Sequence, residues 1–454
     1  MKNLFNVILI WFIFCLTTFL FAEEIDIWEK VFVDINGRPI IDAKAAILMD
    51  GETGQILYSH NPDLRLPNAS TTKIMTALLV VENLDLDSML TASKNVSETP
   101  FTSIYLTDGE QISVKDALAG AIIKSANDAC VLFAESISGD CDKFAQLMNE
   151  RAKELGCKNT NFVTPNGLNH ENHYSTAKDL CVIAKEAIRY PVISELSQRE
   201  SWVLSSRSIN KENLLVKNKQ KYILNYPYAT GLKPGYTKQA GNCLVGTAEK
   251  DGRILISCIL NSSEISAQTA ALMEYGFNRF EKKIILKKDD FREYVKVSNS
   301  EEGQIPARIP MDLFILIPKG FKKTEDYEYK WEFFQDISAP VEEGQVIGKV
   351  IAYKNGEGIA SLDILAEKSA KELPLVSSIK KNIYKPLIII VILVVLVYYA
   401  RKIAKNHGSK RSRFQKKVRR ADISGQSYSR RYKSYTRSKS RPEYKSDTDS
   451  WKRY

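Results

Sequence analysis

The chain has 454 residues, of which 44% are hydrophobic and 26% are charged, and its net charge is +10. This length allows two or three domains of roughly 100–200 residues each. The composition is ordinary for a soluble protein and assigns no class by itself. Residues 401–454 alone carry +15, which leaves −5 for residues 1–400. The charge therefore excludes a basic folded body as the source of the high pI.

The N-terminus has the pattern of a secretory signal peptide over residues 1–22. Lys2 precedes an uncharged, apolar run from Leu4 to Phe21, and Ala22 follows just before two acidic residues. A basic start, an apolar centre and a small residue at the cleavage point are typical of such signals. An uncleaved membrane anchor is the alternative. Both interpretations predict that the rest of the chain is exported.

Residues 23–277 are predicted to form one α+β domain. Two apolar segments flank the turn sequence GETG at 51–54, which indicates a β-hairpin. Strand patterns at both ends of the segment enclose a helical middle, so we expect a mostly antiparallel sheet flanked by helices. The hairpin strands are at 44–50 and 55–60, the helical patterns at 70–84, 114–124, 127–138, 142–156 and 176–189, and the later strand patterns at 221–226, 242–250 and 253–260.

After residue 277 the pattern changes to short β-rich segments separated by turn residues. Asn355-Gly356 is typical of a tight hairpin turn. We predict a small β-sandwich over 278–370, followed by a linker at 371–385. The β-rich segments are 284–288, 294–299, 308–318, 327–334, 345–356 and 359–367.

The segment 386–402 is predicted to be a transmembrane helix. Its first part, PLIIIVILVVLVYYA, carries no charge. This run is shorter than the roughly 20 residues that a spanning helix needs, but its basic and tyrosine flanks can extend it. A core helix is the alternative, although the segment has no polar face. Because Lys and Arg gather on the cytoplasmic side of a span, we expect a single-pass protein of the cell membrane with its body on the extracytoplasmic face.

The tail, 403–454, is rich in Ser, Arg, Lys and Tyr and poor in aliphatic side chains. Such a composition predicts a disordered cytoplasmic segment. Its positive charge suits anionic lipid head groups or nucleic acid. We favour lipid and expect no specific nucleic-acid partner.

Cysteine and histidine form no metal-binding pattern. The seven cysteines show no C-x-x-C and no ligand spacing with the four histidines, so we predict no metal. Disulfide frameworks belong to much smaller exported domains. We therefore expect mostly buried thiols. One disulfide bridge is the alternative, although the sequence does not indicate which cysteines would form it. His170 and His173 lie in a polar loop and are interpreted as surface or loop-structuring residues.

Ser70-x-x-Lys73 is the first candidate catalytic pair. A serine hydroxyl is a poor nucleophile unless a base takes its proton. Positions i and i+3 share one face of a helix, so Lys73 can reach Ser70. With Ser70 at the helix N-cap, free backbone N–H groups can face a developing oxyanion. The pair alone is weak evidence, because an N-cap serine beside a surface lysine gives the same pattern.

Ser125-Ala126-Asn127 lies between two predicted helices. Ser125 can relay a proton, and the Asn127 amide offers both a donor and an acceptor to a peptide. Alone, the motif equally describes a helix cap.

Lys233-Pro234-Gly235 begins a predicted strand. Proline has no N–H to give a sheet, so it indicates either a turn or an edge strand. A glycine at that edge lets a substrate backbone approach closely. An extended peptide could then pair with the edge as an additional strand.

Together and in this order, the three motifs resemble the S-x-x-K, S-x-N and K-T-G set of penicillin-binding proteins and serine β-lactamases. Longer stretches, at 45–79, 155–168, 173–180 and 231–248, are similar to the D-alanyl-D-alanine carboxypeptidases, the low-molecular-mass penicillin-binding proteins. Residues 340–353 resemble the β domain that follows the catalytic domain in that family. The resemblance implies a penicillin-binding/β-lactamase-like α+β domain over 23–277.

The resemblance also implies roles for individual residues. Ser70 would attack the bond between two D-alanines of a peptidoglycan stem peptide, with Lys73 as its base. Ser125 would pass the proton to the departing D-alanine, Asn127 would hold the peptide, and Lys233 would attract its terminal carboxylate. No cofactor is implied. A β-lactam would imitate the substrate and acylate the serine.

The remaining implied residues follow along the same strand. Gly235 would allow close approach, and the backbone N–H of Tyr236 would complete an oxyanion hole with that of Ser70. Thr237 and Lys238 stand next to the motif and are candidates to contact the substrate.

Two departures from the family pattern concern carboxylate recognition. Pro234 stands where the family has a threonine, and 261–277 lacks an arginine that the family often carries there. A lost hydrogen bond to a charged group is worth roughly 1.5–3 kcal/mol, or about ten- to a hundredfold in rate. We expect an active enzyme whose rate or substrate range is altered.

Two alternatives remain. A wall-binding scaffold would bind penicillin without releasing D-alanine. A β-lactamase is disfavoured by the β domain, the membrane anchor and the lack of a recognisable Glu-x-x-x-Asn deacylation loop.

Overall fold

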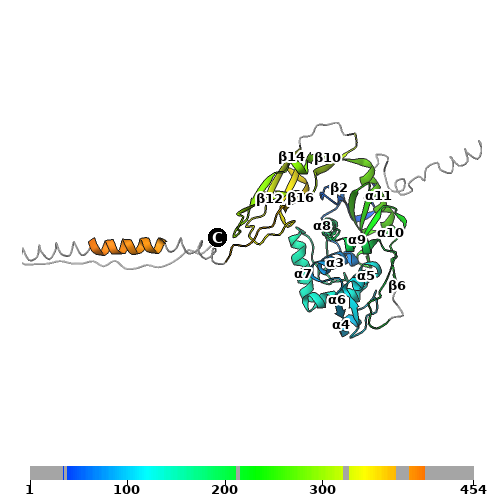
Figure 1. Ribbon diagram of the computed structural model, residues 1–454. Helices are drawn as coiled ribbons and strands as arrows, with labels where there is room; N and C mark the ends of the chain where they lie inside the picture. The colour runs from blue at the N-terminus through cyan, green and yellow to red at the C-terminus, as the bar shows by residue number, and fades with distance from the viewer. Residues whose placement is uncertain (1–33, 35–37, 211–214, 321–326, 375–387, 404–454) are drawn as a thin grey trace, which may run out of the picture. The chain divides into compact units, whose positions relative to one another are not determined.

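The computed structural model describes residues 34, 38–210, 215–320, 327–374 and 388–403 (Figure 1). The predicted signal peptide, most of the predicted linker and the tail from residue 404 lie outside these residues. The chain divides into two compact units, 1–372 and 373–454, which are considered separately.

A five-stranded antiparallel sheet in the order β2-β1-β9-β8-β7 forms the centre of the first domain. The predicted hairpin is confirmed, with Ala46 opposite His60. In the described part of the chain, β7 pairs only with β8 and so forms an edge, which places Pro234 where its missing N–H is tolerated. The strands are β1 (Ala43–Asp50), β2 (Ile56–His60), β7 (Ala229–Thr237), β8 (Gly241–Lys250) and β9 (Arg253–Ser262).

Helices cover both faces of this sheet. Side chains alternate between the two faces of a strand, and β1 shows this directly. Ile47 and Met49 pack into the core shared with helices such as α3 and α8, whereas Ala46 and Leu48 pack into a second core with α10 and α11. Figure 1 shows α3 to α8 gathered on one side of the sheet. The expected α+β domain with an antiparallel sheet is thus confirmed.

The helical middle of the domain agrees with the predicted segments to within a few residues. Two short strand pairs, β3 with β4 and β5 with β6, lie beside these helices. The helices are α3 (Lys73–Asn83), α4 (Lys94–Ser97), α5 (Val114–Ala119), α6 (Asn127–Ser138), α7 (Cys141–Glu154), α8 (Ala177–Ala187), α9 (Pro191–Gln198), α10 (Lys221–Asn225) and α11 (Ile265–Arg279). The short strands are β3 (Met89–Thr91), β4 (Gln111–Ser113), β5 (Ser201–Val203) and β6 (Leu215–Lys217).

The strand predicted at 221–226 is wrong, because most of this segment forms the helix α10. Tyr222 and Tyr226 stack with their ring centroids 5.5 Å apart, as residues four apart on a helix can. The Tyr222 hydroxyl donates to the Thr247 carbonyl oxygen at 2.9 Å. Two buried tyrosines thus override the β-like composition of the segment.

Two sheets build the C-terminal domain of this unit. The pair β10-β13 and the sheet β11-β12-β16-β15-β14 share one hydrophobic core, which includes Leu313 from the first and Ile364 from the second. Asn355 and Gly356 both have positive φ, at 53° and 80°, as their hairpin turn requires. The strands are β10 (Phe280–Leu286), β11 (Glu293–Lys296), β12 (Gln304–Arg308), β13 (Leu313–Pro318), β14 (Tyr327–Phe333), β15 (Val346–Lys354) and β16 (Glu357–Ala366).

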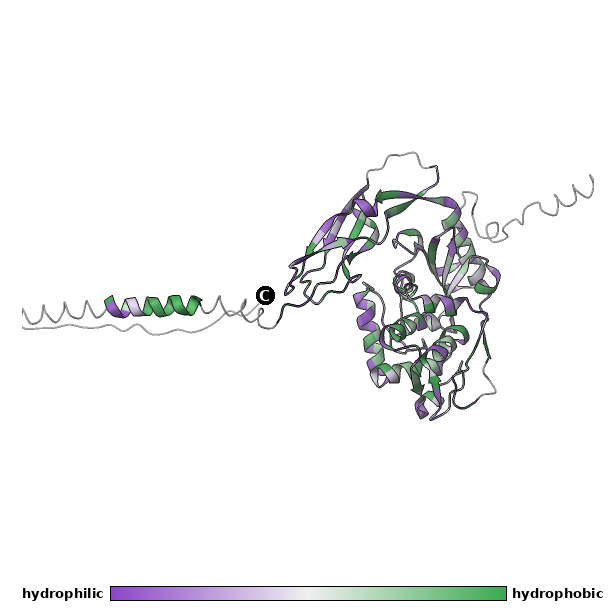
Figure 2. Cartoon of the chain, viewed as in Figure 1, coloured by the Kyte–Doolittle hydropathy of each residue, from purple (hydrophilic) through white to green (hydrophobic). Residues whose placement is uncertain are grey.

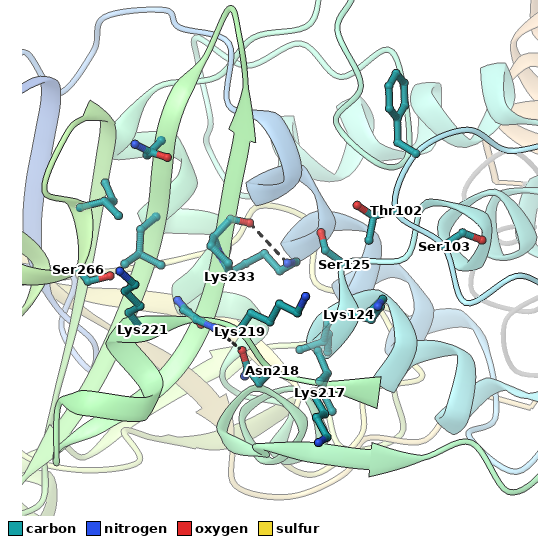
Figure 3. A pocket seen from close by; sticks show the side chains of 18 of the residues that line it. Thr102, Ser103, Lys124, Ser125, Lys217, Asn218, Lys219, Lys221, Lys233 and Ser266 are labelled. Carbon is teal, nitrogen blue, oxygen red and sulfur yellow. Dashed lines mark hydrogen bonds between the residues drawn. The ribbon is translucent and has the colours of Figure 1, made fainter. Parts of the chain in front are cut away.

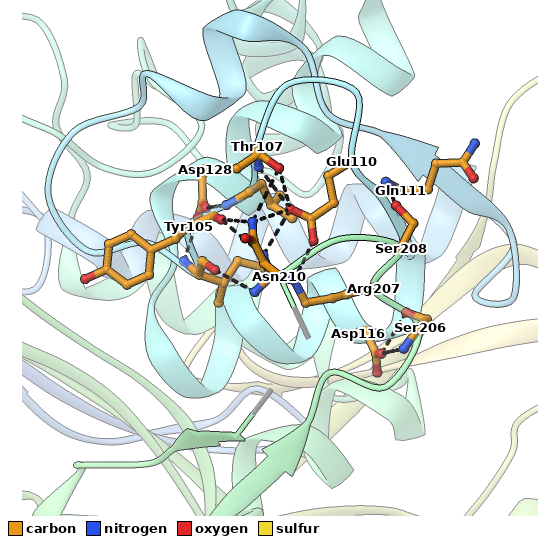
Figure 4. Close-up of polar contacts among 12 residues, drawn as sticks. Tyr105, Thr107, Glu110, Gln111, Asp116, Asp128, Ser206, Arg207, Ser208 and Asn210 are labelled. Carbon is orange, nitrogen blue, oxygen red and sulfur yellow. Dashed lines mark hydrogen bonds and ion pairs between the residues drawn. The ribbon is translucent and has the colours of Figure 1, made fainter. Parts of the chain in front are cut away.

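A buried ion pair fixes the loop between α4 and β4. Arg207 and Glu110 meet at 2.7 Å with both side chains fully buried, and Arg207 also donates to the Ile104 carbonyl oxygen at 2.9 Å (Figure 4). Asp128, in the first turn of α6, accepts backbone N–H groups from Ile104 and Leu106, each at 3.1 Å. The loop is therefore held rigidly against the start of α6.

In the second unit, residues 388–403 form a helix. Figure 2 shows it as hydrophobic over most of its length and hydrophilic at one end. Across the described residues, no helix reaches the length and apolar character that crossing a membrane requires. The predicted span at 386–402 therefore stays a prediction.

The six cysteines in the described part of the chain are all free thiols. Four of them, at positions 130, 181, 243 and 258, are buried, as expected, and no bridge forms among the six.

Candidate active site

Ser70 lies in a 3-10 turn, Ala69–Thr72, that leads directly into α3. The expected N-cap position is therefore wrong, because α3 begins at Lys73 and Ser70 lies in the turn before it. Ala69 adopts a left-handed conformation with φ of 47°, which is uncommon for a residue with a side chain. Strained backbone of this kind persists only where surrounding contacts enforce it.

Contacts from a distant loop enforce the conformation of this turn. A Cβ on Gly167 would overlap the Ala69 carbonyl, so only glycine fits against the turn there. The Thr72 hydroxyl donates to the Ala69 carbonyl oxygen at 2.8 Å and lies 2.8 Å from Nε2 of His173. The Nδ1 atom of His173 accepts from the Val163 N–H at 3.0 Å, so Nε2 carries the proton and donates to Thr72.

This arrangement keeps His173 uncharged. Burial lowers the pKa of His173 to about 4, because the charged imidazole would lose its solvation. Nearby positive charge lowers this pKa further. The interpretation of His173 as loop-structuring agrees with this position, while His170 is exposed.

Lys73 is buried, and its Nζ contacts three oxygen atoms. It lies 2.9 Å from Ser70 Oγ, 2.9 Å from Asn127 Oδ1 and 2.7 Å from the Asn166 carbonyl oxygen. The Asn127 amide is oriented by its Nδ2, which donates to the Pro100 carbonyl oxygen at 3.0 Å. Its Oδ1 therefore faces Lys73 as an acceptor.

The two carbonyl oxygens orient the lysine for proton abstraction. Neither can donate, so together they take both N–H bonds of a neutral amine and leave its lone pair for the Ser70 hydroxyl. Burial lowers the pKa of Lys73 to about 8. At pH 7 roughly a tenth of the molecules would then hold Lys73 in the neutral, basic form.

Ser125 and Asn127 flank the start of α6. Ser125 has φ of 65° and follows a π-helical turn, Gly120–Lys124. Such turns are frequent at functional sites. Ser125 lines the cleft, whereas Asn127 is buried behind it against Lys73. The two residues of the motif thus face different partners.

The edge strand β7 runs along the other side of the site. A Cβ on Gly235 would stand 2.7 Å from the Ser70 backbone nitrogen, so the absence of a side chain lets the strand lie against the nucleophile turn. Tyr236 is exposed, and Thr237 accepts the Ala240 N–H at 3.1 Å through its hydroxyl oxygen. That bond leaves the Thr237 hydroxyl proton free to donate.

Lys233 is a buried cation beside the cleft. Its Nζ lies 3.5 Å from the Pro234 carbonyl oxygen, and it forms no ion pair among the described residues. Burial, together with the charge of Lys73, lowers the pKa of Lys233 to about 7. Figure 3 shows its side chain extending toward Ser125.

A cleft of about 940 Å³ opens between β7, the loop at 101–105 and the start of α11. Ser125, Lys233 and Pro234 are among its lining residues (Figure 3). In the described part of the chain, no group of three or more His, Cys, Asp or Glu side chains is placed to hold a metal ion.

The structure brings the three sequence motifs together around Ser70. Sequence reasoning missed Asn166, which acts through its main-chain carbonyl and so leaves no mark on side-chain chemistry. It also missed the role of Gly167. The only signal available was that both residues lie within the stretch 155–168, which resembles the carboxypeptidase family.

Comparisons with known proteins agree with this arrangement. Residues 33–264 match the family described as D-alanyl-D-alanine carboxypeptidase. The chain belongs to the D-alanyl-D-alanine carboxypeptidase family. Residues 280–372 match the penicillin-binding protein 5, C-terminal domain. The chain is therefore a serine peptidase of the penicillin-binding proteins, and the predicted hydrolase activity is confirmed.

Individual relatives are similar over most of their length. D-alanyl-D-alanine carboxypeptidase DacF of Bacillus subtilis is 34% identical over 75% of this chain and 89% of its own. D-alanyl-D-alanine carboxypeptidase DacC of Escherichia coli is 30% identical over 74% of this chain and 86% of its own. The crystal structure of penicillin binding protein 5 from Haemophilus influenzae superposes with a TM-score of 0.56 at 31% identity, over 74% of this chain and 99% of that protein.

Proposed function

We propose that this carboxypeptidase removes the terminal D-alanine from peptidoglycan stem peptides through an acyl-enzyme on Ser70. The observation that carries the proposal is the position of Lys73, whose Nζ lies 2.9 Å from Ser70 Oγ while two carbonyl oxygens occupy its other bonds. In the neutral form, its lone pair can take only the serine proton. A base in this position makes Ser70 an effective nucleophile.

The acylation step forms one bond and breaks another. Ser70 Oγ attacks the carbonyl carbon between the two D-alanines while its proton passes to Lys73. The C–N bond then breaks, and the leaving amine receives a proton through Ser125. The backbone N–H groups of Ser70 and Tyr236 would stabilise the oxyanion, as donors placed for developing charge do. The close packing of Gly235 on the Ser70 nitrogen supports this pairing.

Hydrolysis completes the cycle without a cofactor. Water attacks the ester carbon and gives its proton to Lys73, the bond to Ser70 Oγ breaks, and Lys73 returns a proton to the serine. Asn127 would position Lys73 through its Oδ1, and the contact with the peptide that the resemblance implies for Asn127 stays a prediction. Lys233 would attract the terminal carboxylate, and its lack of an acidic partner among the described residues supports that role. A β-lactam would enter the same steps and remain as a slowly released acyl group.

The cellular setting is part of the same proposal. A signal peptide at 1–22, a single span at 386–402 and a basic cytoplasmic tail would hold the peptidase domain at the outer face of the cell membrane. The apolar surface of the helix 388–403 supports this anchor. The tail would contact anionic lipid.

The test uses the full-length chain in detergent with a synthetic pentapeptide that ends in D-Ala-D-Ala. We expect D-alanine release, its loss in Ser70→Ala, and full activity in Ser97→Ala, which changes an exposed serine. Intact mass after penicillin treatment should show one added acyl group in the wild type and none in Ser70→Ala. Undiminished D-alanine release by Ser70→Ala would overturn the proposal.

A further inference from the structure

The cleft lacks both of the groups that the family resemblance implies for carboxylate recognition. Pro234 lines it without a hydroxyl, and Ile265 and Ser266, at the start of α11, line it from within the segment 261–277, which contains no arginine. No arginine lines the cleft among the described residues. A C-terminal carboxylate entering the cleft therefore needs another cation besides Lys233.

Lysines supply positive charge in this cleft. Six charged side chains line it, of which five are lysines and one is Glu264. The lysines are Lys124, Lys217, Lys219, Lys221 and Lys233. Three come from one short segment, 217–221, and none of these three forms an ion pair within the described residues. The charge of the cleft therefore favours an anionic ligand, and Glu264 is the only acidic residue among the described lining residues.

Lys219 occupies the position best suited to meet that anion. Figure 3 shows its side chain extending into the cleft, whereas Lys217 turns away from Ser125. The backbone around Lys219 is fixed on both sides. Asn218 donates through Nδ2 to the Ser197 carbonyl oxygen at 3.3 Å and accepts the Gln220 N–H at 3.0 Å. Only the flexible lysine stem has to be ordered when a ligand binds.

We propose that Lys219 binds the C-terminal carboxylate of the substrate and replaces the arginine that this chain lacks. The inference rests on the proposed function of the cleft and extends it to a specificity-determining residue. A lysine is a compact charge with rotatable donors, so it can neutralise a carboxylate without the paired geometry of a guanidinium. Lys219 should therefore contribute charge, with weak demands on orientation.

The test compares two peptides that differ only at the C-terminus, one ending in a free carboxylate and one in an amide. In the full-length chain, Lys219→Ala should lower kcat/KM for the acid peptide about tenfold, as expected for a bond to a charged group. For the amide peptide, kcat/KM of Lys219→Ala should equal that of the wild type. Lys219→Arg should restore most of the activity on the acid peptide. Lys153→Ala, which removes an exposed lysine of α7, controls for net charge.

A binding experiment separates this inference from the proposed reaction. In the Ser70→Ala background, Lys219→Ala should weaken equilibrium binding of the acid peptide about tenfold and leave that of the amide peptide unchanged. If Lys219→Ala weakens binding of both peptides equally, Lys219 has a structural role and the inference is overturned. Unchanged binding of both peptides would overturn it as well. If the peptides discriminate in this way but the wild type releases no D-alanine, only the proposed reaction fails.

Discussion

Gly235→Ala tests whether contact between β7 and the nucleophile turn positions the reacting groups. The added Cβ would lie 2.7 Å from the Ser70 nitrogen and 3.1 Å from the Thr71 nitrogen, both backbone atoms that cannot rotate away. Ordinary contact begins at 3.4 Å, so the strand and the turn must separate by about 0.7 Å. The two N–H donors proposed for the oxyanion hole belong to these two segments.

A displacement of this size should affect the reaction more than the fold. A misplacement of about 1 Å can cost a hundredfold in rate, so we expect acylation by penicillin to slow roughly 10- to 100-fold. Overpacking typically costs about 1–3 kcal/mol of unfolding free energy. The rate of acyl-enzyme formation, followed by intact mass, measures the first effect, and thermal unfolding measures the second.

A second glycine separates these two effects. Gly139 ends α6 with φ of 85°, and a Cβ added to it would have no atom within 4 Å. Gly139→Ala should destabilise by about 1 kcal/mol through its backbone conformation alone and leave acylation unchanged. If Gly235→Ala acylates as fast as the wild type, the strand does not position the nucleophile, and the assigned oxyanion hole is wrong.

Three further changes follow from the same geometry. The rate of acylation should rise with pH through about 8 as Lys73 loses its proton. Because Lys233 becomes neutral already through about pH 7, kcat/KM for carboxylate peptides should instead level off between about pH 7 and 8 and fall above 8. A pH-independent rate of acylation would argue against Lys73 as the base. Pro234→Thr should keep the fold and release D-alanine as fast or up to about tenfold faster, because it restores a hydroxyl; a large loss would show that proline has its own role. Arg207→Met should lower the free energy of unfolding by about 3–5 kcal/mol, measured by denaturant titration, because it leaves Glu110 buried and unpaired.

The sequence predicted those parts of the fold that depend on local pattern. The apolar segments on either side of the turn sequence at 51–54 and the turn residues Asn355-Gly356 were sufficient to locate two hairpins. Pro234 excluded a central strand but left a turn or an edge strand open, and the motifs around it favoured the edge strand that β7 forms. The strand predicted at 221–226 was wrong because the structure of this segment does not depend on local pattern. Its helix depends on Tyr222 packing into a core formed by residues far away in sequence.

The candidate site divides in the same way. Ser70, Lys73 and the later motifs were found because their side-chain chemistry and spacing are visible in the sequence. The orientation of Lys73 could not be predicted, because it depends on the main-chain carbonyl oxygen of Asn166. Every residue has such a carbonyl, so the sequence does not mark this one. The lysines of 217–221 also gave no signal, because exposed lysines are common and only the cleft gives them a shared position.

The 3-10 turn of Ser70 shows why long-range contacts matter to the chemistry. Ala69 has an unfavourable positive φ. Gly167 has no side chain and so leaves room for the Ala69 carbonyl, and the Thr72 hydroxyl donates to that carbonyl oxygen from within the turn. His173 fixes Thr72, and its low pKa keeps it neutral throughout the range in which Lys73 titrates. The support beneath Ser70 is therefore independent of pH over that range. A pH profile of acylation then reports the lysines alone, and not a change in the position of the nucleophile.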